Sequence, residues 1–248
     1  MKKIILIGLL AGELFAQSAV EIAQKSYEMI SGYKSSLSQT TMILRDKKGV
    51  ESIRKLEIKK LENVNGDKSL INFLYPLDIK DTKLLSYEVI GKDDKQWLYL
   101  PALKRIKRIS SRNKSGSFMA SEFSYEDISS QNYKNYSYLK GVNEVIVEGK
   151  SYFKITRIPK DKHSGYSKQI IFIDKNSYLA DRGEYFDRRG RLLKKISFLE
   201  YKKINAIYRI VKIKIYNLKN GKSSELIWDK DEINLPLNKN DFKKRALK

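Results

Sequence analysis

The sequence predicts a mainly β fold, an antiparallel meander that curls on itself, with one helix at its start. Many short segments alternate apolar and polar residues with a period of two, and turn residues separate them at even spacing. The 248 residues include sixteen tyrosines, which suit a β-rich chain. No linker or low-complexity tract divides the chain, so we expect one domain over residues 17–248. The chain has no cysteine, but it is long enough to form a core without disulfides.

The first sixteen residues have the layout of a secretory signal peptide. Two lysines follow the first methionine, residues 4–10 are almost all apolar, and Ala16 is a small residue at a candidate cleavage point. The apolar run is too short for a lasting membrane anchor, which needs about 20 apolar residues. We therefore predict export, with removal of residues 1–16. The alternative is a buried N-terminal helix.

A helix is predicted directly after this segment. Ser18 and Glu21 have the spacing of a capping box, and Gly32 is a stop signal. The apolar residues near one face of this helix are Ile22, Ala23, Tyr27 and Ile30.

From there on the apolar period changes to two. Residues 38–44 and 51–60 flank a polar turn that ends in Gly49, which is typical of a hairpin. The remaining strands of the first half are expected at 69–75, 84–90 and 96–100. In the second half they are expected at 144–147, 152–158, 168–173, 178–186, 191–200, 207–216 and 223–228.

Periodicity does not decide the structure of residues 100–128. As a helix, this segment would place Lys104, Arg108 and Arg112 on one face. As a strand, it would point Ile106 and Ile109 to opposite sides. Its first half holds six basic residues, namely Lys104, Arg105, Lys107, Arg108, Arg112 and Lys114.

The formal net charge of +21 predicts attraction to anionic surfaces. In an exported protein these surfaces are phospholipid or lipopolysaccharide head groups, not nucleic acid. The alternative is a solvated, lysine-rich surface without a specific partner. The basic residues are spread along the whole chain, which favours a specific site less than a stripe would.

The sequence offers little for covalent chemistry. His163 is the only histidine, and without cysteine a zinc site would need carboxylates alone around one imidazole. No Gly-x-Ser-x-Gly elbow supports a serine nucleophile, and the two Gly-Lys-Ser runs lack the first glycine of a phosphate loop. We therefore expect no catalytic residue, no metal and no cofactor, and we read His163 as a surface-loop residue.

Residues 97–128 resemble the signature of the outer-membrane lipoprotein-sorting protein family, the LolA-like periplasmic proteins. An aromatic strand ends in Trp-x-Tyr-x-Pro, a basic return strand follows, and then come Lys-Ser-Gly-Ser-Phe-Met and Phe-x-Tyr-Glu-Asp. The resemblance continues at 38–40, at 148–153, and at Phe242 and Leu247. One departure lies at 181–184, where a smoother alternating strand is expected.

The resemblance implies a curled, incompletely closed antiparallel β-barrel with a helical lid over a hydrophobic cavity. Such proteins bind lipid acyl chains or lipoproteins and carry them across the periplasm toward the outer membrane. The subgroup also implies an inner-membrane RND-type exporter as a partner, for which the protein would be an accessory lipid-binding subunit. A third alternative is an unrecognised enzyme that acts on envelope lipids. The family pattern implies no catalytic residue here.

Eight residues are the candidates for the cavity wall, since a flexible or aromatic side chain suits a variable acyl tail. The alternative for each is an ordinary core position. Gly116 would allow a tight bend into the lid, and Ser124 with Asp127 would cap a short helical turn. The eight candidates are Met42, Leu44, Phe73, Trp97, Tyr99, Phe118, Met119 and Phe123.

The basic residues keep two interpretations. Lys104, Lys107 and Arg112 are candidates for contact with anionic head groups at the cavity mouth or on a membrane surface. Alternatively, the basic residues of 104–114 pair with acidic residues of the same motif and fix its bend. Those acidic residues are Glu122, Glu126 and Asp127.

Overall fold

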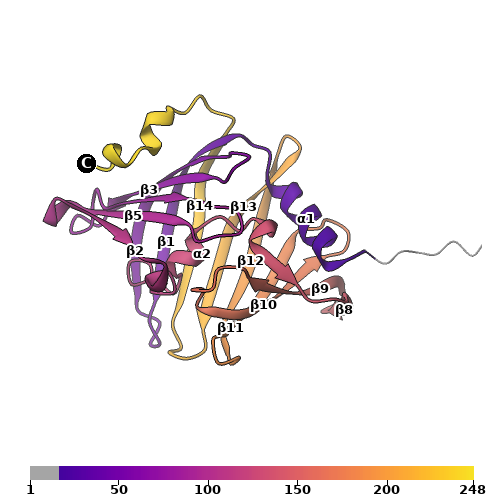
Figure 1. Cartoon of the computed structure of the whole chain (residues 1–248). Coiled ribbons are helices and arrows are strands. Elements are labelled where there is room, and N and C mark those ends of the chain that lie inside the picture. Colours follow the sequence, from indigo (N-terminus) through magenta and orange to yellow (C-terminus); the bar gives the residue numbers. More distant parts are fainter. Residues whose placement is uncertain (1–16) are drawn as a thin grey trace, which may run out of the picture.

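The computed structural model describes residues 17–248 as one curled β-sheet with a few helical segments (Figure 1). The predicted signal peptide, residues 1–16, lies outside the described residues. The first seven strands are β1 (Ser35–Arg45), β2 (Glu51–Leu61), β3 (Lys68–Tyr75), β4 (Lys83–Tyr87), β5 (Lys95–Leu100), β6 (Arg105–Ile109) and β7 (Tyr136–Tyr138). The other seven are β8 (Asn143–Val147), β9 (Lys150–Pro159), β10 (Tyr166–Asp174), β11 (Ala180–Asp187), β12 (Leu192–Ile204), β13 (Ile207–Asn217) and β14 (Ser223–Ile233).

The sheet follows the chain as a meander, with one long-range pairing at its centre. The strand order is β6-β5-β4-β3-β2-β1-β14-β13-β12-β11-β10-β9-β7, and β8 pairs with β9 off this path. Because β1 pairs with β14, the two halves of the meander join into one surface. All pairings are antiparallel. The end strands β6 and β7 do not pair, so the predicted curled and incompletely closed barrel is confirmed.

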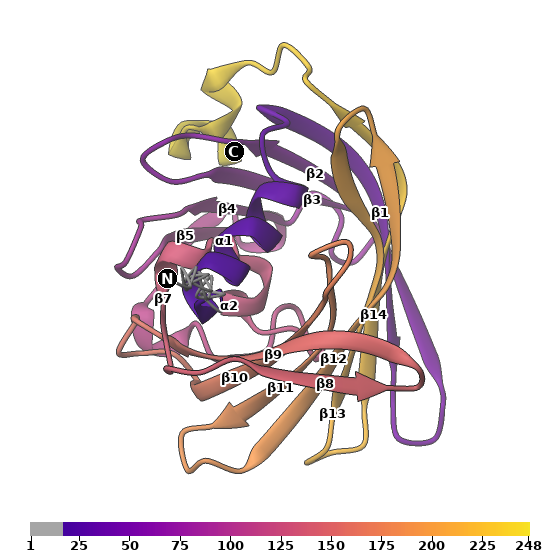
Figure 2. The same cartoon turned by 90° about the vertical axis from the view of Figure 1, so that its right-hand side faces the viewer.

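Helix α1 (Ala19–Ile30) begins at the predicted capping box. The Ser18 backbone N–H donates to Glu21 Oε2 at 2.8 Å, and the Glu21 N–H donates to Ser18 Oγ at 3.4 Å. The helix contacts β13, β7 and β9, and it buries Ala19, Ile22 and Ala23. The sheet curves around α1 and a short second helix (Figure 2). Over residues 17–248, no helix has the length and apolarity needed to cross a bilayer.

The segment that periodicity left undecided is a strand followed by a bend. Strand β6 pairs with β5 along its full length. After it, Phe118 N–H donates to the Phe123 carbonyl at 2.7 Å, and Tyr125 N–H donates to the Gly116 carbonyl at 3.1 Å. Helix α2 (Tyr125–Ile128) then begins at the predicted cap, with Ser124 and Asp127 in a capping box. We call residues 114–128 the lid segment.

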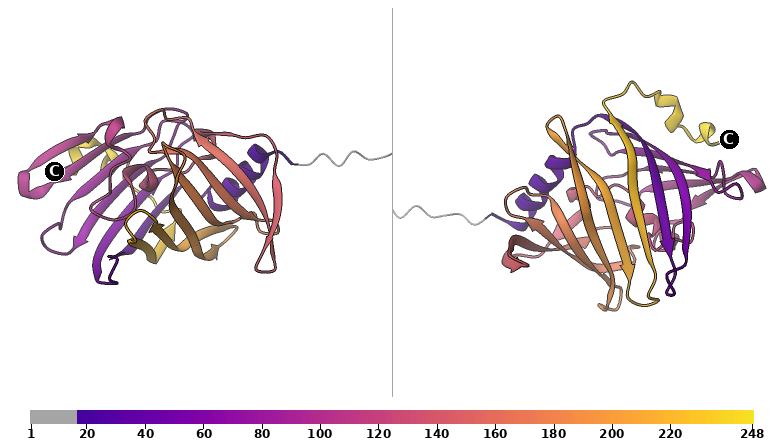
Figure 3. Two further views of the ribbon diagram at one scale, coloured as in Figure 1. Left: turned by 90° about the horizontal axis from the view of Figure 1, so that it is seen from below. Right: turned by 180° about the vertical axis from the view of Figure 1, so that it is seen from behind.

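The sheet packs apolar residues on both of its faces. The larger cluster lies on the concave side and includes Ile22 of α1 and Phe118 and Phe123 of the lid segment. The smaller cluster joins Leu70 and Leu85 to the C-terminal segment. That segment holds two 3₁₀ turns, Lys239–Phe242 and Lys244–Leu247, which pack on β3 and β4. Seen from behind, the orange and yellow strands run directly beside the purple strands (Figure 3).

The departure noted at 181–184 is a local irregularity in β11. Phe172 pairs with Arg182, but the next residue of β10, Ile173, pairs with Ala180, so Asp181 is an extra residue in the ladder. Gly183 is buried against its neighbours, and a Cβ there would lie 2.9 Å from Ile196 Cγ2. The glycine is needed for this close approach of side chains.

Candidate functional site

A cavity of about 260 Å³ lies between the concave face of the sheet, α1 and the lid segment. Its walls combine strands from both halves of the chain, because the β1–β14 pairing brings them to one surface. Most of the wall consists of aliphatic and aromatic side chains, which include Leu56, Ile58, Ile155, Ile171, Ile213 and Leu226. Such a lining favours an apolar ligand or an acyl chain.

Three of the eight predicted cavity residues line this cavity, namely Met42, Phe118 and Phe123. Phe73 is fully buried in the same core, with its ring centroid 5.7 Å from that of Phe118, but it lies behind the wall. Leu44 and Met119 pack against the same core and are not part of the lining. The structure thus brings these six residues together on the concave side.

Trp97 and Tyr99 lie elsewhere and are not part of the cavity lining. They pack with the C-terminal segment on the other face of the sheet. The physical reason is strand alternation, because neighbouring residues point to opposite faces and Leu98 is the one that points inward. The other tryptophan, Trp228 on β14, lines the cavity.

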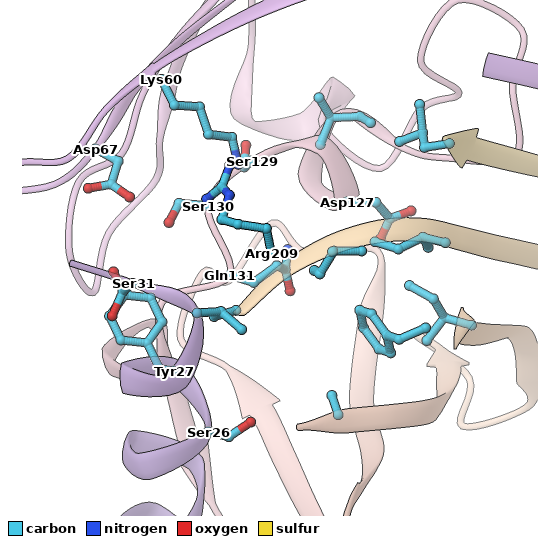
Figure 4. A pocket seen from close by; sticks show the side chains of 18 of the residues that line it. Ser26, Tyr27, Ser31, Lys60, Asp67, Asp127, Ser129, Ser130, Gln131 and Arg209 are labelled. Carbon is cyan, nitrogen blue, oxygen red and sulfur yellow. The ribbon is translucent and has the colours of Figure 1, made fainter. Parts of the chain in front are cut away.

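One end of the cavity is polar, and sequence reasoning did not identify it. Figure 4 shows Lys60 and Arg209 pointing toward one region near Ser129 and Ser130. Lys60 comes from β2 and Arg209 from β13, the two strands that flank the central β1–β14 pair. Asp67 also lies at this end.

The Arg209 guanidinium is held firmly in place. Its Nε donates to Asp231 Oδ2 at 2.6 Å, and its terminal nitrogen donates to Asp231 Oδ1 at 3.2 Å. The guanidinium carbon lies 4.0 Å from the centroid of the Tyr33 ring. Both members of the ion pair are nearly buried, so the position of this charge is fixed.

The Lys60 ammonium differs from Arg209 because it has no hydrogen-bond or ion-pair partner among residues 17–248. Burial, and then the charge of Arg209, lower the pKa of Lys60, and nearby carboxylates partly oppose this. A signal in the sequence was available, since Lys60 follows Leu56 and Ile58 at the same period of two.

The lid segment is anchored to the sheet by buried acidic residues. The Asp127 carboxylate accepts hydrogen bonds from Lys194 Nζ at 3.0 Å and from the Tyr166 hydroxyl at 2.9 Å. Glu126 accepts from the Ser164 hydroxyl at 2.6 Å and from a backbone N–H of the same loop. Burial, and then the charge of Asp127, raise the pKa of Glu126 to about 7.

These contacts correct one interpretation of the basic stretch 104–114. None of its basic residues pairs with Glu122, Glu126 or Asp127 within the described residues. Glu122 instead accepts from the Asn217 side chain at 2.6 Å. All of the basic residues of this stretch except Lys114 are exposed.

Of the three candidates for head-group contact, Lys104, Lys107 and Arg112 are all exposed. Lys107 and Arg112 line a second hollow, over Leu98 and Ile109, and Lys104 does not. This hollow lies apart from the cavity. Lys114 is buried and pairs with Asp161 at 3.3 Å. Contact with head groups by these residues therefore stays a prediction.

His163 lies in a loop, as expected, and is partly buried. Its Nδ1 is 3.2 Å from Asp93 Oδ2 and 3.7 Å from Asp161 Oδ1. Asp161 also pairs with Lys114, so this acidic group is already neutralised in part by the chain. None of the three residues lines the cavity.

Comparison with known proteins places the fold in a wider group. A family model described as "Uncharacterized protein" matches residues 65–248. A putative outer membrane lipoprotein-sorting protein domain from Vibrio parahaemolyticus, solved by crystallography, is 40% identical, with a TM-score of 0.86 over 92% of this chain and 97% of that one. A DUF1329 family protein from Desulfovibrio piger is 28% identical, with a TM-score of 0.87 over 93% and 98%.

A LolA superfamily protein from Nitrosomonas europaea shares the fold, with a TM-score of 0.77 at 18% identity, over 93% of this chain and all of that one. No curated protein matches the chain. The RND-type exporter that the resemblance implies as a partner gains no support from these three structures.

Proposed function

The chain belongs to the outer membrane lipoprotein-sorting protein family, and on this premise we propose that it is a periplasmic carrier. It binds the acyl chains of a lipid or lipoprotein in its cavity and moves them toward the outer membrane. The protein is not an enzyme in this proposal, because a carrier needs an apolar enclosure and no reactive group.

The apolar wall of the cavity carries this proposal. Side chains such as Ile155, Ile213 and Leu226 offer an acyl chain an apolar surface built from both halves of the sheet. Transfer of each CH₂ group from water into such a surface stabilises the complex by about 0.8 kcal/mol. A single acyl chain of ordinary length therefore supplies enough free energy for firm binding.

The lid segment suits a carrier that must load and release its ligand. Phe118 and Phe123 contribute to the cavity wall, and the anchors of this segment are polar contacts to the sheet. Polar anchors of this kind hold the segment in place without filling the space beneath it.

Export is part of the proposal and has its own test. If residues 1–16 are a signal peptide, the mature protein recovered from the periplasm begins at Gln17. N-terminal sequencing checks this. A full-length product in the cytoplasm would contradict a role in the cell envelope.

Tryptophan fluorescence tests the binding function, because only Trp228 of the two tryptophans lines the cavity. In a Trp97→Phe background, addition of dodecanoate should shift or quench the emission of Trp228. The matched control is Trp228→Phe, in which Trp97 reports from the outer cluster and its emission should stay constant. Unchanged Trp228 emission, together with no retention of the lipid on gel filtration, would refute binding in this cavity.

A further inference from the structure

We propose that the polar end of the cavity binds the anionic head group of the ligand between Lys60 and Arg209. The ligand class is then an acyl amphiphile with a carboxylate or phosphate head, not a neutral lipid. This inference rests on the proposed function, because the acyl chain must occupy the apolar part of the same cavity.

The placement of the two cations supports this assignment. Arg209 is fixed by Asp231 and by stacking on Tyr33, so its charge stays at the cavity wall. Lys60 points to the same region from β2, on the other side of the β1–β14 pair, and its ammonium has no ion-pair partner among the described residues (Figure 4). Asp231 balances the charge of Arg209, but Lys60 has no carboxylate in direct contact, so an anion placed between the two cations gains attraction from both at a partly desolvated site.

The carboxylates near this end already have donors in the protein. Glu62 accepts from the backbone N–H groups of Gly32 and Lys34, at 2.9 and 2.7 Å. Asp67 accepts from Asn63 N–H at 3.1 Å.

Two further carboxylates are engaged in the same way. Glu88 accepts from Asp67 N–H at 3.0 Å and from the Asn135 side chain at 2.8 Å, and Asp231 is occupied by Arg209. Burial is the first cause that raises the pKa of Glu62, Asp67 and Glu88, as it is the first cause that lowers the pKa of Lys60. The Lys60 ammonium, in contrast, has no hydrogen-bond or ion-pair partner among the described residues.

Strand β2, which carries Lys60, also supplies the apolar surface that such a ligand needs. Leu56, Ile58 and Lys60 follow one another on the inner face of β2, so the wall changes from apolar to cationic within two steps. Ser130 also lies at the cationic end and places a hydroxyl group beside the two cations (Figure 4), whereas the Ser129 hydroxyl already donates to the Tyr125 carbonyl at 3.3 Å. The acyl chain would extend from there toward Leu56 and beyond.

The test compares three ligands with the same chain and different heads, namely dodecanoate, dodecyl phosphate and dodecanol. Affinities are measured at pH 7 by displacement of a fluorescent fatty acid. In the wild type, at least one anionic ligand should bind about tenfold more tightly than dodecanol, or more. The preference between dodecanoate and dodecyl phosphate identifies the head-group chemistry.

The variant Lys60→Met keeps most of the length of the side chain and removes its charge. It should lower the affinity for the preferred anion about tenfold and leave dodecanol binding unchanged. The matched control is Lys55→Met, on the same strand but exposed, which should change neither affinity.

The outcomes separate this inference from the proposed function. If the wild type binds all three ligands equally, the head-group site is refuted and the acyl cavity stands. If none of them binds, the proposed function itself fails. If Lys60→Met weakens dodecanol as much as the anion, the effect is not one of charge and the assignment to Lys60 is overturned.

Discussion

The buried ion pair between Lys194 and Asp127 gives the sharpest test of how the lid segment is held. Only 8% of the Lys194 side chain and 4% of the Asp127 side chain are exposed. We consider the substitution Lys194→Met, which fills the same space but leaves the Asp127 carboxylate buried without its counter-ion. Asp127 keeps two other donors, the Ser124 N–H at 2.8 Å and the Tyr166 hydroxyl at 2.9 Å.

The removal of one partner of a buried pair costs about 3–5 kcal/mol. Because two donors remain on Asp127, we expect the lower end of this range, about 3 kcal/mol of unfolding free energy. With a urea m-value of about 3 kcal/mol/M, the unfolding midpoint should fall by about 1 M. Equilibrium urea unfolding, followed by circular dichroism, measures this directly.

The neighbouring lysine provides the control. Lys195 is exposed on the same strand, and Lys195→Met should change the unfolding free energy by no more than about 0.5 kcal/mol. If Lys194→Met is as stable as Lys195→Met, the pair does not anchor the lid segment, and our reading of its buried contacts is wrong.

Three further substitutions test the buried Glu126 carboxyl, the glycine in β11 and the outer apolar cluster. The folded-state pKa of Glu126, about 7, lies above its usual 4.5, so the unfolded chain releases this proton first and the free energy of unfolding falls as pH rises from 4.5 to 7. Glu126→Gln should remove this fall, which is on the order of 1–3 kcal/mol, and an unchanged pH profile of stability would contradict the assignment. Gly183→Ala should destabilise by about 1–3 kcal/mol in urea unfolding, because its Cβ would crowd Ile196, and a neutral effect would show that β11 has room. Phe242→Ala should lower the free energy of unfolding by about 3–5 kcal/mol and leave dodecanoate affinity unchanged, since Phe242 packs on the outer face of the sheet. Loss of dodecanoate binding would show that the outer cluster contributes to the binding site.

Much of the fold was predictable because its signals are local. The capping boxes at Ser18 and Ser124 correctly located the starts of α1 and α2. Turn residues between alternating segments located most strands, and the resemblance supplied the open curl. Strand β7 was missed, since three residues carry too little alternation to be recognised. Strand β6 was ambiguous, because its solvent-facing basic residues mask the period of two.

The faces of the strands could not be read in the same way. Alternation separates two sets of residues but does not say which set is inside, and here both faces of the first half are covered. Trp97 and Tyr99 were therefore assigned to the cavity, although the C-terminal segment covers them on the other side. Lys60 was overlooked for a related reason, because a lysine in a strand is usually taken as a solvent-facing residue.

Native mass spectrometry of the protein purified from the cell envelope tests directly whether it carries a lipid. We expect a fraction of the protein to carry one acyl lipid, released on denaturation as a species with an anionic head. We also expect delipidated protein to take up dodecanoate in a one-to-one complex. Protein that is free of lipid when isolated, and that binds none when lipid is added, would show that this protein is not an acyl-lipid carrier.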